Sequence, residues 1–166
     1  MKLIFHIFLL LSSFSFALSQ DSSDIARKFV GRILIGGKTI VPIGFERWGG
    51  GLIGDTPYWT TEFYNSKSKK LILILKTEIG REGKNPKWKI LDAIITDLDT
   101  SKFDRRNYDD IASCSTSNGE IVNAILVITN HSNDSVRDAW RIDRTQSKFQ
   151  RLYSRDLKCI FFPPED

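Results

Sequence analysis

Short apolar runs separated by turn-forming residues are the feature that most constrains how this chain can fold. Residues 71–75 are consecutive branched aliphatic residues, a run too short for a buried helix and typical of a strand covered on both faces. Residues 121–129 form the strongest strand pattern and should lie at the centre of a sheet. Residues 58–64 alternate between two faces. The pattern predicts a mainly β, antiparallel domain of about seven or eight strands, arranged as a curled sheet, a sandwich or an open barrel.

Gly36 and Gly37 predict a tight hairpin near the start of this pattern. Two glycines accept the positive φ of a primed turn, so residues 33–35 should pair with the run that reaches Val41. Pro42 should end that second strand, because proline has no N–H to give to a ladder. Before the hairpin, polar residues 22–24 can cap one short N-terminal helix.

The segment after Asn133 fits either a helix or a β-hairpin. If residues 144–147 form a turn, Ile142 faces Phe149, and the neighbouring ionic and polar residues also face matching partners. A continuous helix would cross residues 143–148 without one apolar side chain. We therefore favour the hairpin.

Two further segments complete the expected topology. Residues 96–118 follow a predicted strand at residues 88–95, and their polar composition predicts a long loop. A last strand over residues 157–162 would place Cys159 and Phe161 on one face.

The first nineteen residues have the pattern of a secretory signal peptide. Met1 and Lys2 precede an apolar run at residues 3–11, and a small-residue ending at residues 17–19 places the cleavage before Gln20. No cysteine near that site could carry a lipid anchor, and no later run is long enough to cross a bilayer. We expect a single secreted or periplasmic domain over residues 20–166, without stable insertion into a membrane.

Cys114 and Cys159 are the only cysteines of the chain. An even pair in an exported protein most often forms a disulfide, whereas two free buried thiols are the other reading. We predict the disulfide.

Motifs for catalysis or for a cofactor are weak. Residues 36–39 copy the end of a phosphate-binding loop, but Arg32 stands where the first glycine is required. His131 is the only histidine after residue 19 and lies in a polar segment without a nucleophile signature. Residues 97–101 copy the start of a calcium loop without its glycine and final glutamate. We expect no catalytic residue, no cofactor and no metal.

Tryptophan placement suggests one recognition surface. Trp59, Trp88 and Trp140 lie in strand patterns, where core packing is their ordinary role. Trp48 instead abuts three glycines, so Trp48 and the nearby Tyr58 are candidates for binding a partner.

Basic residues are concentrated near the C-terminus of a chain whose formal charge is +4. They form either a site for an anionic partner or a solvated strand face, and export makes nucleic acid an unlikely ligand. The segment from residue 137 to residue 158 holds Arg137, Arg141, Arg144, Lys148, Arg151, Arg155 and Lys158. All but the last two are candidate binding residues.

These observations favour a non-enzymatic, exported binding or inhibitor-like module that recognises an envelope or extracellular partner, either a protein or a polyanionic glycan. A hydrolase acting on glycans is the alternative, because it needs only two carboxylates across a cleft. Its candidates are Glu46, Asp55, Glu62, Asp92, Asp97 and Asp99. A structural envelope protein without activity is the third reading.

Overall fold

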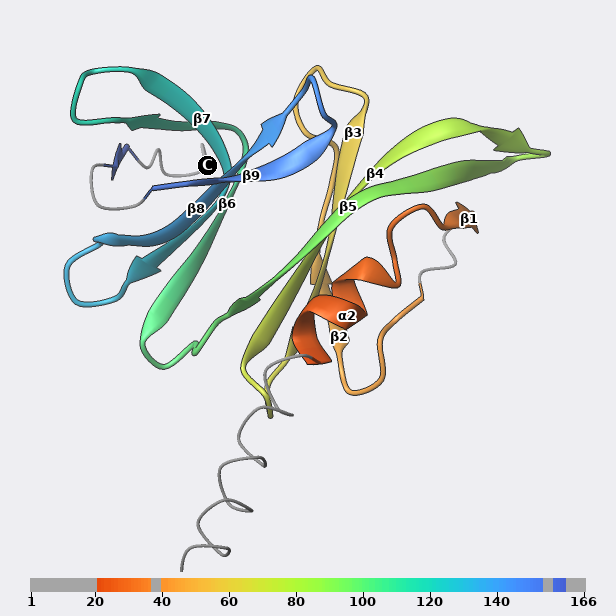
Figure 1. Ribbon diagram of the computed structural model, residues 1–166, viewed down its shortest axis with the longest axis horizontal. Helices are drawn as coiled ribbons and strands as arrows, with labels where there is room; N and C mark the ends of the chain where they lie inside the picture. Colours follow the sequence, from red (N-terminus) through yellow and green to blue (C-terminus); the bar gives the residue numbers. More distant parts are fainter. Residues whose placement is uncertain (1–20, 37–39, 154–156, 161–166) are drawn as a thin grey trace, which may run out of the picture.

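The computed structural model describes residues 21–36, 40–153 and 157–160 (Figure 1). Over these residues the chain forms two antiparallel sheets and one short helix, α2 (Asp21–Arg27). The sheets pack through a shared core and do not close into a barrel, so the predicted mainly β class is confirmed. The predicted signal peptide and its cleavage site lie outside the described residues.

The first sheet has β4 at its centre. Its order is β1 (Ile33–Ile35), β5 (Asn85–Asp97), β4 (Lys70–Glu82), β3 (Tyr58–Asn65) and β2 (Glu46–Gly49). Leu71 and Leu73 face the core between the sheets, whereas Ile72 and Ile74 pack under the N-terminal segment with Phe29. The run over residues 71–75 is therefore covered on both faces, as predicted.

The second sheet has β7 at its centre, which also confirms the prediction for residues 121–129. Its order is β10 (Lys158–Cys159), β6 (Phe103–Ser115), β7 (Ile121–Asn130), β8 (Val136–Asp143) and β9 (Lys148–Leu152). Strands β8 and β9 form the predicted hairpin in the predicted register, with Ile142 opposite Phe149 and Asp143 opposite Lys148.

Two of the three tryptophans that we predicted to pack in the core are buried there. Trp140 packs between the sheets with Leu126 and Ile128. Trp88 is buried in the first sheet, where its ring meets Trp59 edge to face with centroids 5.3 Å apart. Such a pair contributes about 0.5–1.5 kcal/mol beyond its buried area.

The long loop predicted for residues 96–118 is wrong, because most of it is strand β6. Only residues 98–102 connect β5 to β6, and β6 pairs with β7 from Phe103 to Ser115 around one irregularity. The backbone N–H and C=O groups of β6 pair with those of β7, and this pairing does not depend on the polarity of the β6 side chains. The tertiary context therefore outweighs the polar composition of the segment.

The hairpin predicted at Gly36 and Gly37 is also not formed. Strand β1 pairs with β5, so that Leu34 lies opposite Trp88, and Ile40 and Val41 are in no strand. Residues 37–39 lie outside the described part. Pairing with the long β5 buries Leu34 against the core beneath α2, which a local two-stranded hairpin could not do.

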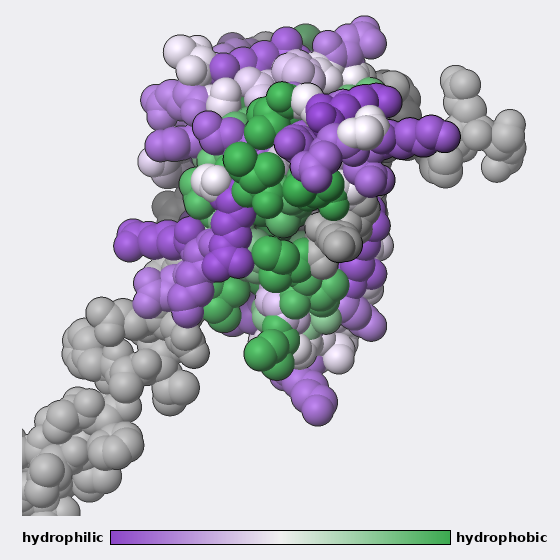
Figure 2. Space-filling model, turned by 90° about the vertical axis from the view of Figure 1, so that its right-hand side faces the viewer, coloured by the Kyte–Doolittle hydropathy of each residue, from purple (hydrophilic) through white to green (hydrophobic). Residues whose placement is uncertain are grey.

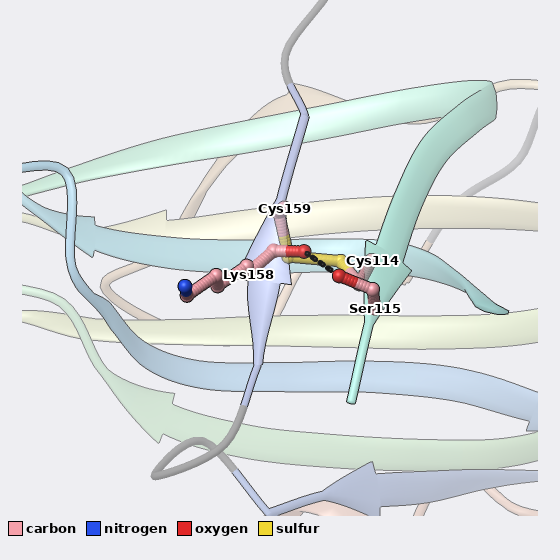
Figure 3. The surroundings of a disulfide bond; sticks show 4 residues. All are labelled: Cys114, Ser115, Lys158 and Cys159. Carbon is pink, nitrogen blue, oxygen red and sulfur yellow. Dashed lines mark hydrogen bonds between the residues drawn. A yellow bond between two sulfur atoms is a disulfide. The ribbon is translucent and has the colours of Figure 1, made fainter. Parts of the chain in front are cut away.

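A disulfide joins Cys114 to Cys159, as predicted (Figure 3). The two residues are direct partners across β6 and β10, with Cα atoms 4.0 Å apart, and the Ser115 hydroxyl donates to the Lys158 carbonyl beside them. The predicted last strand is seen only as β10, and residues 161–162 lie outside the described part. The disulfide is consistent with an oxidising location outside the cytoplasm. Within the described ranges, no helix has the length and apolar content to cross a membrane.

The double variant Cys114→Ser/Cys159→Ser should unfold at lower urea concentration than the wild type. The bridge spans 45 residues of sequence. The chain-entropy treatment gives about 4 kcal/mol for such a loop, so we expect a loss of roughly 2–4 kcal/mol in the free energy of unfolding. Wild-type protein treated with reductant is the control and should show the same loss. A difference below about 1 kcal/mol would contradict the prediction.

Candidate functional site

The predicted basic residues fall into two groups on different parts of the β8–β9 hairpin. One group contains Arg137, which lies at a bulge in β8. At this bulge Thr129 pairs with Val136, whereas Ile128 pairs with Asp138. Arg137 therefore has no residue opposite it, and its guanidinium lies against Asp138 with an Nε–Oδ2 distance of 2.7 Å. A bulge often re-aims one side chain in this way.

Arg137 and Arg151 line a hollow that we call the helix cleft. It has a volume of about 840 Å³ and lies between α2, β5 and the β8–β9 hairpin. Both guanidinium groups pair with the carboxylate of Asp138, whose side chain is only 8% exposed. Arg137 also covers the Phe103 ring, 4.4 Å from its centroid. Their two positive charges thus share one carboxylate within the cleft.

The other carboxylates of the helix cleft are engaged as well. Asp92 accepts hydrogen bonds from the backbone N–H of Ala93 and, across the sheets, from that of Phe149 at 2.8 Å. Asp97 forms an ion pair of 2.5 Å with Lys70. Most charged residues of the cleft therefore have partners within the protein, and Arg27 is the lining base without an ion pair among the described residues.

Arg141 and Arg144 line a second hollow, which we call the arginine groove. It has a volume of about 450 Å³ and lies where the loop at residues 50–57 approaches β7 and β8. Its remaining lining is mostly apolar: Ile53, Thr56, Ile121, Val122, Asn123, Ala124, Ile125 and Ile142. The loop near Trp48 and the basic segment thus meet in one place.

The guanidinium groups of the arginine groove have no carboxylate partner among the described residues. Arg141 donates through Nε to the side-chain oxygen of Gln150 at 2.8 Å, which orients the guanidinium without neutralising it. Arg144 and Lys148 are exposed, and the Asp143 carboxylate between them accepts backbone N–H groups of the turn. This groove therefore keeps a net positive charge.

Tyr58 does not line the arginine groove but forms hydrogen bonds with the segments around it. Its hydroxyl shares a hydrogen bond of 2.9 Å with the hydroxyl of Ser147 in the β8–β9 turn. On the neighbouring loop, Ile53 donates its backbone N–H to the Tyr58 carbonyl. The loop, the strand and the turn that surround the groove are held together by these contacts.

Trp48 lies outside the lining of both hollows. It is 39% exposed, and its ring stacks on Tyr64 with centroids 4.3 Å apart. The Arg105 guanidinium lies 4.9 Å from the centroid of the same indole, a cation–π distance. Trp48 thus packs against a partly buried guanidinium.

Glu62 and Arg105 form that buried charge cluster, which sequence reasoning did not identify as a pair. The Glu62 side chain is 1% exposed and its carboxylate pairs with Arg105 from the opposite sheet. Burial lowers the pKa of Arg105. The position of Glu62 between Thr61 and Phe63, in a strand with buried residues, could have indicated a buried charge. Its partner could not be predicted, because Arg105 lies in a segment that we predicted to be a loop.

The carboxylates considered for hydrolysis do not gather into one site. Glu46 and Asp55 are exposed, Glu62 is paired with Arg105, and only Asp92 and Asp97 share a cleft. The Lys69 ammonium and the Ser101 hydroxyl and N–H hold the pKa of Asp99 well below its usual range. These hydrogen bonds also occupy the oxygens that the calcium-loop pattern would need.

Comparison of the chain with protein-family models, with curated proteins and with solved structures finds no match.

Replacing Arg105 by methionine should destabilise the fold strongly. The Glu62 carboxylate would stay buried without the guanidinium, and breaking a buried pair on one side costs about 3–5 kcal/mol. The double variant Glu62→Met/Arg105→Met should lose much less, because no charge remains to be desolvated. Urea unfolding followed by tryptophan fluorescence measures both. If both variants lose the same free energy of unfolding, the unpaired Glu62 charge is not the cause of the loss, and the prediction is wrong.

Proposed function

We propose that this protein is a secreted or periplasmic, non-enzymatic binding module that recognises an acidic segment of an envelope or extracellular protein in the arginine groove. One observation carries the proposal: two arginines without a carboxylate partner line a groove of about 450 Å³ together with several aliphatic residues. The predicted leader and the disulfide support the export part of the proposal.

The electrostatics of the groove favour an anionic ligand. A guanidinium binds carboxylates through paired N–H donors, and such charge-assisted bonds are roughly twice as strong as neutral ones. Arg141 uses Nε for Gln150, which leaves its terminal N–H groups for a ligand. In the helix cleft, by contrast, Asp138 already takes up two guanidinium groups. The arginine groove is therefore the better anion site.

The aliphatic lining of the groove favours a polypeptide over a glycan. Ile53, Val122, Ala124 and Ile142 offer few hydrogen-bonding groups, whereas sugar hydroxyls require many. A peptide that alternates acidic and apolar side chains can place its carboxylates on the arginines and its apolar side chains on the aliphatic lining. A sulfated glycan would use the charge alone.

The test uses a fluorescein-labelled hexapeptide of alternating aspartate and leucine, and its counterpart with asparagine in place of aspartate. Fluorescence anisotropy should show binding of the acidic peptide only. Arg141→Glu/Arg144→Glu should weaken it by about tenfold or more, because two charge-assisted interactions are lost. Lys67→Glu/Lys102→Glu makes the same change of net charge at exposed positions outside the groove and should leave affinity within about twofold at moderate salt.

Two outcomes would overturn the proposal. Equal binding of the acidic and the neutral peptide would remove the role of the arginines. Competition by a sulfated oligosaccharide with higher affinity than the peptide would identify a polyanionic glycan as the ligand instead.

A further inference from the structure

An exposed apolar surface lies at the β1 edge of the first sheet. We call it the isoleucine face, and Figure 2 shows it as a band of apolar side chains with hydrophilic side chains on both sides. Six branched aliphatic residues contribute to it, each at least 40% exposed: Ile33, Ile35, Ile40, Val41, Ile43 and Ile79.

The strand register brings Ile33, Ile35 and Ile79 together. Strands β1 and β4 flank β5, and Lys89 of β5 lies between Ile33 of β1 and Thr77 of β4. Adjacent strands are about 4.8 Å apart, so Ile79 lies within two strand spacings of β1. Ile40 follows β1 after only a few residues, which limits how far it can lie from Ile35.

The isoleucine face projects from the molecule. Ile43 is 101% exposed, at a turn where Phe45 donates its N–H to the Pro42 carbonyl. None of the six residues lines the helix cleft or the arginine groove. A convex apolar surface fits a soft, extended partner better than a partner side chain that needs a pocket.

The isoleucine face has basic residues at its rim and one basic residue, Lys89, beside Ile33 within it. Lys28, Arg32, Lys84 and Lys89 are exposed and have no ion pair among the described residues. The two carboxylates at this end of β4 are already neutralised, Glu78 by Arg81 and Glu82 by Lys87. Beyond Ile43, Glu46 and Arg47 contribute opposite charges.

We propose that the isoleucine face docks on the surface of a lipid membrane with anionic headgroups. The apolar side chains enter the boundary between headgroups and acyl chains, and the basic rim meets the lipid phosphates. A second copy of this chain would instead place Lys89 and Arg32 beside their own counterparts. An added protein strand would find only short free edges at this end of the sheet, the three residues of β1 and residues 78–82 of β4.

Co-sedimentation with vesicles tests the proposal directly. The wild type should bind phosphatidylcholine vesicles that contain about 30% phosphatidylglycerol, should bind pure phosphatidylcholine much less, and should be released by salt. Ile43→Ser should reduce partitioning by about tenfold, because one aliphatic side chain no longer leaves water. Ile160→Ser changes an exposed isoleucine outside the face and should leave partitioning unchanged.

Charge and self-association are tested separately. Arg32→Glu/Lys89→Glu should abolish the preference for anionic vesicles and leave urea unfolding unchanged, since both residues are exposed. Equal partitioning of Ile43→Ser and the wild type would overturn the proposal. Sedimentation velocity measures the oligomeric state of both proteins. If the wild type is a dimer and Ile43→Ser is a monomer, the face binds a second copy of the chain, and the membrane proposal is overturned as well.

Discussion

A buried ion pair between the two sheets is the interaction on which the rest of the structure depends. Glu62 comes from β3 and Arg105 from β6, so the pair forms only when the sheets stand in one relative position. Removing each charge from water costs several kcal/mol, and good geometry is needed to offset that cost. Trp48 and Tyr64 supply part of that environment, because their stacked rings lie beside the guanidinium. The Tyr64 hydroxyl also donates to the carbonyl of Leu98, the residue that follows β5.

The elements that could be predicted from sequence are those whose evidence is local. The period of two over residues 58–64, the apolar run over residues 71–75 and the matched pairs of the β8–β9 hairpin each lie within one or two neighbouring strands. Strand β6 has no such local evidence, because what makes it a strand is β7 on one side and the Glu62 carboxylate of the other sheet. The partner of β1 is more than fifty residues away in sequence, and no local pattern distinguishes it from the turn at Gly36.

In the candidate site, too, the residue types could be predicted from the sequence, but the contacts that they make could not. Sequence could count the basic residues and place them on one hairpin, but their value for binding depends on which carboxylates reach them. The β8 bulge puts Arg137 beside Asp138, which also takes up Arg151, whereas Arg141 meets only the neutral Gln150. One aspartate therefore offsets part of the charge of Arg137 and Arg151, whereas Arg141 and Arg144 have no such carboxylate.

The unequal lengths of the strands explain why the two proposed surfaces are independent. Strand β3 pairs with β4 only as far as Thr77, so the last part of β4 has β5 alone beside it and extends away from the second sheet (Figure 1). Apolar residues on that extension have no opposing sheet to cover them, and an exposed patch of this kind marks an interaction surface. The arginine groove, in contrast, needs both sheets, because its walls come from the loop before β3 and from β7 and β8. A ligand in the groove would therefore leave the isoleucine face uncovered, so that both surfaces can be occupied at once.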